Sequence, residues 1–281
     1  MTAGHPMTSP RTIVVIGATS GLGRRAAQRL AVGGHRLVLA GRDPRRADEL
    51  RAELPEADVI SGDVATMDGI EAVVKQINDA VDRVDTLVNN AGVMVPSRQV
   101  TADGTELNLA VHHLAPYSMT SLLLPLLRAG DGRVVNVNSE GHRAALFHGG
   151  PIELDFTDLN SENDYDPFLV YSRTKLANLM FSYELQRRHP ELTAVAVHPG
   201  MVRTDLGRHF PRLQVAAMHA ISMSAQKGAA PVVALAADAD VQPGAYYDRF
   251  RPVQSSPFSY DRAAAGRLWA ETERLRGPFG D

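Results

Sequence analysis

The feature that most limits what this chain can fold into is a repeated alternation of short strand-like runs and helical segments. The strand-like runs are seven, and in chain order they read TIVVIG, HRLVLAG, ADVISGD, VDTLVNNAG, GRVVNVNS, LTAVAVHPG and GAYYD. Strands that are apolar along most of their length and separated by helices are typical of a parallel sheet covered on both faces. We therefore expect an α/β fold with a doubly wound, mostly parallel sheet of seven strands and helices on both sides.

The segments between these runs predict helices and one irregular region. Helical spacing covers residues 44–54, 68–81 and 105–127, a segment around Tyr171, and two segments near the carboxyl end. Residues 1–10 read as a flexible tail, and residues 11–281 contain no linker or repeat, so one domain is expected. Residues 201–225 lack periodicity and are the predicted substrate lid. Their apolar side chains favour an apolar ligand or equally pack the lid against the body; they are Phe210, Met218, Ile221 and Met223.

The composition argues against several classes of function. A formal net charge of -3 and a pI near 6.4, with arginines scattered among acidic residues, disfavour a nucleic-acid partner. The chain has no cysteine, and its 10 histidines include no ligand spacing such as HExxH, so no disulfide and no metal site are expected. No signal-peptide pattern and no run of about 18 apolar residues is found. The sequence thus predicts a soluble, cytoplasmic protein without a membrane anchor.

A glycine-rich segment, GATSGLG, joins the first strand-like run to the first helical one. Glycines from Gly17 to Gly23 allow a sharp turn and a close approach of the backbone to a pyrophosphate, which binds at the amino end of the following helix. The same pattern also occurs in ordinary tight turns, but here the strand and helix flank it as nucleotide binding requires. The segment therefore predicts a dinucleotide site.

The end of the second run indicates which dinucleotide is bound. Enzymes selective for NAD place a carboxylate at this point for the ribose 2'-hydroxyl, whereas a 2'-phosphate needs a cation. Gly41 stands at the carboxylate position and Arg42 follows it, so NADP(H) is preferred over NAD(H), with Arg24 as a second candidate phosphate contact. Both arginines would alternatively be solvated surface charges.

Tyr171 and Lys175 lie four positions apart in a helical segment, so their side chains are neighbours on one helix face. A phenol normally has a pKa near 10, and an adjacent ammonium group lowers that pKa by favouring the phenolate. The pair is a candidate proton donor. Taken alone, the spacing favours two ordinary surface residues on an amphipathic helix, and the rest of the chain has to decide.

Five motifs in order and spacing carry a resemblance to a known family. They are GATSGLG, NNAG at 89–92, a serine that closes the fifth run, YSRTK at 171–175 and HPGMVRTDL at 198–206. Together they resemble the short-chain dehydrogenases/reductases, which have a single-domain Rossmann fold, and the likeness extends from about Thr12 to Leu275. Within that family the chain looks most like the retinol dehydrogenase and protochlorophyllide reductase group.

The resemblance implies a role for each residue that matches a motif. Tyr171 would exchange a proton with the carbonyl or alcohol oxygen, Lys175 would lower its pKa and bond the nicotinamide ribose, and Ser139 would donate to the same oxygen. Each of these residues taken singly has a structural explanation, but jointly they favour the family roles. The implied cofactor-binding residues are Gly17, Thr19, Ser20, Gly21, Leu22, Gly23, Arg42, Asp63, Val64, Asn90, Ala91, Gly92, Tyr171, Lys175, Pro199, Gly200, Val202 and Thr204.

One catalytic position departs from the family pattern. The family carries an asparagine on the long helix whose main-chain carbonyl holds a water, and this chain has His112 there. Pro116 has no N–H, so the carbonyl four residues earlier, that of His112, loses its helical partner. Our hypothesis is that this carbonyl is exposed for the same water and that His112 takes the fourth catalytic place. The alternative is a histidine satisfied within the helix.

The sequence therefore predicts an NADPH-dependent oxidoreductase that acts on a small-molecule carbonyl or alcohol, with a lipophilic ketone or aldehyde as the favoured substrate. Two alternatives stay open: a catalytically silent NADP-binding sensor or scaffold on the same fold, and a reductase of C=C bonds. The helix that carries Tyr171 is apolar nearly all round, and the long helix before it has the same character. Because the family usually dimerises through these two helices, a homodimer is expected. Burial under the final helices would explain the pattern equally well.

Overall fold

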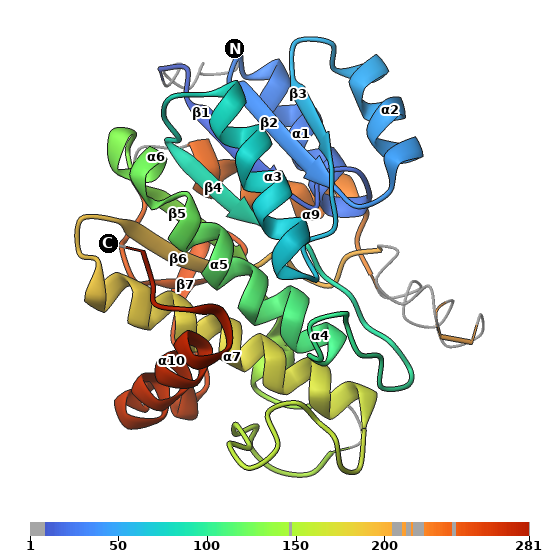
Figure 1. The fold of residues 1–281 in the computed structure, drawn as a ribbon, viewed down its shortest axis with the longest axis vertical. Coiled ribbons are helices and arrows are strands. Elements are labelled where there is room, and N and C mark those ends of the chain that lie inside the picture. The colour runs from blue at the N-terminus through green and yellow to red at the C-terminus, as the bar shows by residue number, and fades with distance from the viewer. Residues whose placement is uncertain are drawn as a thin grey trace.

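The computed structural model describes residues 9–145, 148–203, 210–211, 215, 222–237 and 240–280. One sheet of eight strands runs through the molecule in the order β3-β2-β1-β4-β5-β6-β7-β8, and seven of the strands are parallel (Figure 1). Their bounds are β1 Thr12–Ile16, β2 Arg36–Gly41, β3 Asp58–Ser61, β4 Thr86–Asn89, β5 Arg133–Val137, β6 Thr193–His198, β7 Tyr246–Asp248 and β8 Arg251–Val253.

The predicted α/β class and the doubly wound, mostly parallel sheet are confirmed, but the sheet has eight strands where seven were expected. The additional strand, β8, pairs antiparallel with β7 at the sheet edge. It is only three residues long and contains Pro252, which has no N–H to donate. A proline in so short a run counts against a strand, and such strands occur only at edges.

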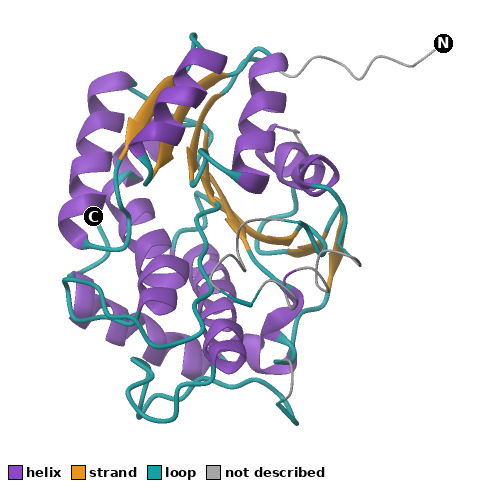
Figure 2. Cartoon of the chain, turned by 90° about the vertical axis from the view of Figure 1, so that its right-hand side faces the viewer, coloured by secondary structure: helices purple, strands orange, loops and turns teal. Residues whose placement is uncertain are grey.

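Helices cover both faces of the sheet, and Figure 2 shows the strands between the two helical layers. Helices α1 Gly21–Val32, α2 Pro44–Glu53 and α9 Ala225–Ala237 pack on one face. Helices α3 Met67–Ala80, α5 Ala115–Leu122, α6 Leu124–Ala129, α7 Pro167–Arg188 and α10 Arg262–Arg276 contribute to the core on the other face. Within the described residues, no helix combines the length and apolarity needed to cross a lipid bilayer.

The helix predicted over 105–127 is interrupted at two places. It consists of α4 Leu107–Leu109, a π-helical turn η1 Ala110–Leu114, and then α5 and α6, which meet at Leu123. Each interruption lies beside a proline, Pro116 or Pro125, because a proline ring removes one helical hydrogen bond and clashes with the preceding turn.

Helix α7 is buried on nearly every side within a single chain. Its side chains pack against β6 and η1 on the inside and against α10 on the outside, where Leu268 contacts the cluster around Met180. Trp269 of α10 stacks on Phe181 with ring centroids 6.0 Å apart. The apolar circumference that suggested a homodimer is therefore covered by α10 of the same chain, and the pattern requires no second copy.

Candidate active site

A cavity of about 660 Å³ opens at the carboxyl ends of the parallel strands, beside β1 and β4, where the order of the strands reverses. It brings together residues that lie far apart in the sequence. Of the residues that the sequence assigns to cofactor or catalysis, it is lined by Gly17, Thr19, Ser20, Gly21, Leu22, Arg42, Asp63, Val64, Asn90, Ala91, Gly92, Ser139, Tyr171, Lys175, Pro199, Gly200 and Val202.

Three assigned residues are not in that lining. Gly23 and His112 lie behind the cavity wall. Thr204 is outside the described residues, as are Met218 and Ile221 of the predicted lid. The described ends of the lid segment are joined, because Val202 and Met223 form a parallel bridge.

The glycine turn leaves no room for side chains. Gly17 has φ +85°, and a Cβ there would lie 2.7 Å from Cα of Ala91. A Cβ on Gly23 would lie 2.1 Å from the carbonyl oxygen of Gly17. Asn90 holds the turn to β4, because its Nδ2 donates to that same oxygen at 2.8 Å. The amino end of α1 therefore lies directly against the strands.

The amino end of α1 has no side-chain cap. Ser20 at its N-cap makes no capping hydrogen bond. By contrast, α2, α3, α7 and α10 are each capped by a side chain, from Asp43, Thr66, Asp166 and Asp261. The uncapped N–H groups of α1 face the cavity, and unpaired N–H groups with a positive dipole end suit a phosphate. The residues present thus fit a dinucleotide.

The two arginines predicted as phosphate contacts differ in whether their guanidinium groups are already paired. Arg42 lines the cavity, is exposed, and has no ion-pair partner among the described residues. Arg24 is already engaged, because its guanidinium pairs with Glu53 at 2.9 Å and with Glu49 at 3.2 Å. The second phosphate contact at Arg24 stays a prediction, and it would require this guanidinium to leave its two carboxylates. Arg46 of α2, which the sequence did not single out, lines the cavity instead.

Position 41 has no space for a carboxylate. A Cβ on Gly41 would lie 2.2 Å from Oγ1 and 2.3 Å from Cγ2 of Thr19. An acidic side chain at position 41, where NAD-selective enzymes bond a ribose 2'-hydroxyl, is thus disfavoured by the packing of Thr19. Arg42 follows the strand, and the next residue, Asp43, caps α2 with its carboxylate.

Three polar side chains meet at the inner end of the cavity. Ser139 follows β5, while Tyr171 and Lys175 come from adjacent turns of α7, which begins at the Asp166 cap. Nζ of Lys175 donates to the carbonyl oxygen of Val137 at 2.9 Å and lies 6.0 Å from the centre of the Tyr171 ring. A proton donor, a hydroxyl and an ammonium group therefore share one small space.

The charge states of the pair differ from the expectation. Burial raises the pKa of Tyr171, against a smaller lowering by a hydrogen bond with Ser139. Burial also lowers the pKa of Lys175 to about 7. The predicted lowering of the Tyr171 pKa by Lys175 is not found in the ligand-free chain, because a site of low polarity disfavours both charged forms. At neutral pH Tyr171 is therefore a phenol, which is the form that donates a proton.

His112 is satisfied on both ring nitrogens. Nε2 accepts from the N–H of Val93 at 3.1 Å, so Nδ1 carries the proton and bonds Oγ1 of Thr174 at 2.9 Å. Burial, followed by the nearby Lys175 charge, keeps the pKa of His112 well below its usual range. The ring lies edge-on to Tyr171 with centroids 5.3 Å apart. His112 is thus a neutral side chain that supports the position of Tyr171.

The His112 carbonyl lacks its helical partner at Pro116, as expected, but it is not left open. Nδ2 of Asn178 donates to it at 2.8 Å. Nδ2 of Asn138 in turn donates to Oδ1 of Asn178 at 2.9 Å. A buried amide therefore already takes one lone pair of this carbonyl, and the hypothesis that the carbonyl also holds a water stays a prediction.

Comparison with known proteins decides the family. Residues 11–151 match the sequence profile described as short chain dehydrogenase. Retinol dehydrogenase 14 of Mus musculus is 35% identical over 95% of this chain and 86% of its own length. The chain belongs to the short-chain dehydrogenase family.

Retinol dehydrogenase 13 of Homo sapiens is also 34% identical, over 95% of this chain and 85% of its own length, so this short-chain dehydrogenase belongs to the retinol dehydrogenase-like group. A protein of Streptomyces sp. (strain C5), assigned as a daunorubicin C-13 ketoreductase, is 34% identical over 92% of this chain and 90% of its own length. The crystal structure of an uncharacterised protein from Mycobacterium paratuberculosis superposes with a TM-score of 0.76 at 30% identity and covers 98% of both chains.

Sequence reasoning missed several residues of this short-chain dehydrogenase that border the cavity or support it. Glu140 and His198 line it next to Ser139, and Asn178 holds the His112 carbonyl. Asn178 had a usable signal, because an amide three positions after Lys175 in an apolar helix needs a buried partner. Glu140 had none, since the tyrosine hydroxyl that bonds it, that of Tyr246, comes from near the other end of the chain.

Burial of Lys175 predicts a characteristic pH dependence of stability. Below pH 7 both folded and unfolded chains carry the ammonium, and the full penalty of burying it is present. Between pH 7 and the ordinary value of 10.5 the unfolded chain binds more protons, so stability rises with pH. From pH 6.5 to 9.5 the wild type should gain about 3 kcal/mol relative to Lys175→Met, measured by urea unfolding without nucleotide. Parallel pH curves for the two proteins would show that the ammonium is not buried.

Proposed function

We propose that this short-chain dehydrogenase is an NADPH-dependent oxidoreductase that transfers hydride between the nicotinamide and a carbonyl or alcohol carbon. The observation that carries the proposal is a single cavity that contains both the uncapped amino end of α1 and the cluster of Ser139, Tyr171 and Lys175. A phosphate site without the cluster would indicate binding only. The cluster adds a proton donor and an oxyanion donor next to it.

The three side chains divide the work of proton transfer. The bound nicotinamide supplies the hydride, or accepts it in the oxidative direction. Tyr171, protonated at neutral pH, gives its phenolic proton to the substrate oxygen. The hydroxyl of Ser139 donates a hydrogen bond to the same oxygen and stabilises the negative charge that develops there. Lys175 has a pKa of about 7, so near neutral pH its amine can both hold and release a proton. It is the candidate to replace the proton that Tyr171 gives up.

The proposed preference for NADPH depends on the residues at the carboxyl end of β2. Thr19 excludes a side chain at Gly41, and Arg42 is the guanidinium that borders the cavity there without an ion-pair partner among the described residues. A 2'-phosphate would gain a charge-assisted hydrogen bond from Arg42, whereas the 2'-hydroxyl of NADH would gain little.

Arg42→Ala is therefore expected to weaken NADPH binding about tenfold and to change NADH binding by less than about twofold, the loss of one charged hydrogen bond. Fluorescence titration with each nucleotide measures both constants. Arg24→Ala is the matched control, because its guanidinium is held by Glu49 and Glu53. Equal losses for the two nucleotides in Arg42→Ala would show that the residue does not read the 2'-phosphate.

The substrate that we propose is a lipophilic ketone or aldehyde. The cavity beside Ser139 and Tyr171 is bordered by apolar side chains, which include Val93, Met94, Phe168 and Met201. The relatives carry the names of an alcohol dehydrogenase and a ketoreductase, the two directions of one hydride transfer.

The test follows NADPH consumption against a panel of lipophilic aldehydes and ketones. Turnover is expected with at least one member of the panel. Tight binding without turnover on any carbonyl would favour the silent sensor instead. Turnover only on conjugated alkenes would favour a C=C reductase.

A further inference from the structure

The turn that follows Ser139 controls where its hydroxyl lies. The 3-10 helix η2 Glu140–His142 begins directly after the serine, and the N–H of Gly141 donates to its Oγ at 3.1 Å. Because that N–H takes a lone pair of Oγ, the hydroxyl proton is directed elsewhere. A Cβ on Gly141 would lie 3.3 Å from both Oγ of Ser139 and Cε1 of Tyr171, so the turn packs on both side chains. A shift of η2 would move Oγ away from the substrate oxygen.

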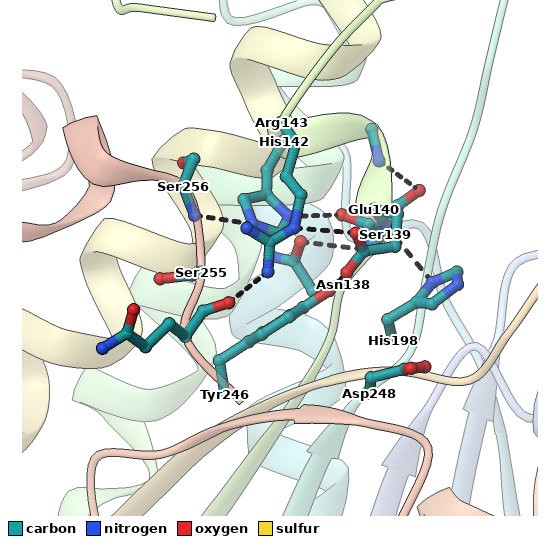
Figure 3. A network of polar contacts seen from close by, with 12 residues as sticks. Asn138, Ser139, Glu140, His142, Arg143, His198, Tyr246, Asp248, Ser255 and Ser256 are labelled. Carbon is teal, nitrogen blue, oxygen red and sulfur yellow. Dashed lines mark hydrogen bonds and ion pairs between the residues drawn. The ribbon is translucent and has the colours of Figure 1, made fainter. Parts of the chain in front are cut away.

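Three contacts join this turn and the residue that follows it to one distant segment, residues 246–256, which we call the C-terminal brace (Figure 3). The hydroxyl of Tyr246 donates to Oε1 of Glu140 at 2.6 Å. The N–H of Ser256 donates to Nε2 of His142 at 3.2 Å. The guanidinium of Arg143 bonds Oε2 of Glu140 at 2.7 Å and also the carbonyl oxygen of Gln254.

The His142 and Tyr246 side chains at the centre of these contacts are buried. His142 is 0% exposed and Tyr246 is 1% exposed, and their rings meet edge-on at 4.8 Å. Because Nε2 of His142 accepts from Ser256, Nδ1 carries the proton and bonds the carbonyl oxygen of Ser139 at 2.7 Å. Both ring nitrogens of His142 are therefore bonded, as buried polar groups require.

Glu140 is held as a carboxylate at the centre of this group. Burial alone would raise its pKa, but the hydrogen bond from Tyr246 and the charge of Arg143 together bring the pKa below its usual value. An anionic acceptor makes the bond from the tyrosine hydroxyl stronger than a neutral one would be.

We propose that the C-terminal brace is a positioning device for catalysis, in which Tyr246 and Ser256 bind Glu140 and His142 of the η2 turn so that Ser139 presents its hydroxyl to the substrate oxygen. The proposal rests on the role of Ser139 given above. The brace lies outside residues 11–151, which match the family profile, so it belongs to the part of the chain that the profile does not describe.

The test uses Tyr246→Phe, which removes one hydroxyl and keeps the ring against His142. Tyr247→Phe is the matched control, because its hydroxyl accepts from the N–H of Gln242 and makes no hydrogen bond with η2 among the described residues. Turnover and the NADPH dissociation constant are measured for both variants in the wild-type and Ser139→Ala backgrounds. Hydrogen exchange of residues 139–143 is measured with NADPH present.

We expect Tyr246→Phe to lower kcat about tenfold in the wild type and less than about twofold in Ser139→Ala, because coupled residues are not additive. NADPH binding should be unchanged, and with Ser139 present, exchange at Gly141 and His142 should rise in Tyr246→Phe and not in Tyr247→Phe. Equal losses of kcat in both backgrounds, or unchanged exchange, would overturn the brace proposal. If Ser139→Ala itself keeps full turnover, the proposed function of Ser139 fails instead.

Discussion

Tyr171→Phe is expected to abolish turnover while leaving NADPH binding intact. The substitution removes only the phenolic O–H, and burial keeps that group protonated in the wild type. A positioned general acid contributes about 10²- to 10⁴-fold to the rate, so kcat should fall by about 10³-fold or more. The ring would still lie edge-on to His112, so the wall of the cavity is retained. Single-turnover oxidation of bound NADPH with an excess of ketone measures the loss directly.

The control for this result is Tyr117→Phe. Tyr117 lies on α5 outside the cavity, and its hydroxyl donates to the carbonyl oxygen of Gly277 at 3.1 Å. Its loss should lower stability by about 1 kcal/mol, a typical hydrogen bond, and leave kcat unchanged. A Tyr171→Phe protein that keeps more than about a tenth of the wild-type kcat would reject Tyr171 as the proton donor.

Gly23→Ala is expected to destroy nucleotide binding and to destabilise the fold. Its Cβ would lie 2.1 Å from the carbonyl oxygen of Gly17 and 2.4 Å from Nδ2 of Asn90, so α1 must move away from the turn. Overpacking of this kind costs about 1–3 kcal/mol. The displaced helix would also withdraw its amino-terminal N–H groups from the phosphates, so NADPH binding should weaken by about 100-fold or more.

Gly266→Ala is the matched control, because Gly266 lies inside α10 and a Cβ there meets no atom within 4 Å. Alanine in place of glycine within a helix should raise stability by about 0.5–1 kcal/mol and leave NADPH binding unchanged. Urea unfolding and nucleotide titration of the two variants measure both effects. If Gly23→Ala binds NADPH as the wild type does, the glycine turn is not the phosphate site.

The cavity was predictable from the sequence because its parts are local. The turn at Gly17 requires a residue that tolerates φ +85°, and the strand before it is apolar throughout, so both leave a signal in a few consecutive letters. The spacing of Tyr171 and Lys175 likewise follows from one helical turn. The long helix over 105–127 was less well predicted, because tertiary packing decides where a proline breaks it.

The charge states were not predictable from the same letters. An ammonium group lowers the pKa of a neighbouring phenol when both groups are in contact with solvent. Burial opposes this effect, because it disfavours both the ammonium and the phenolate. In the folded chain burial lowers the pKa of Lys175 to about 7 and raises that of Tyr171. For each group the loss of solvation outweighs the attraction between the two charges.

The sequence by itself determined the alternation of strands and helices, the glycine turn before α1 and the helical spacing of Tyr171 and Lys175. Tertiary structure alone decided that Glu53 engages Arg24, that Asn178 covers the His112 carbonyl and that the brace holds η2. Local patterns repeat with the period of a helix or a strand and can be read from neighbouring letters. A contact such as that of Glu140 with Tyr246, which are 106 residues apart, depends on the register of the sheet and the packing of its edge, and it leaves no period in the sequence.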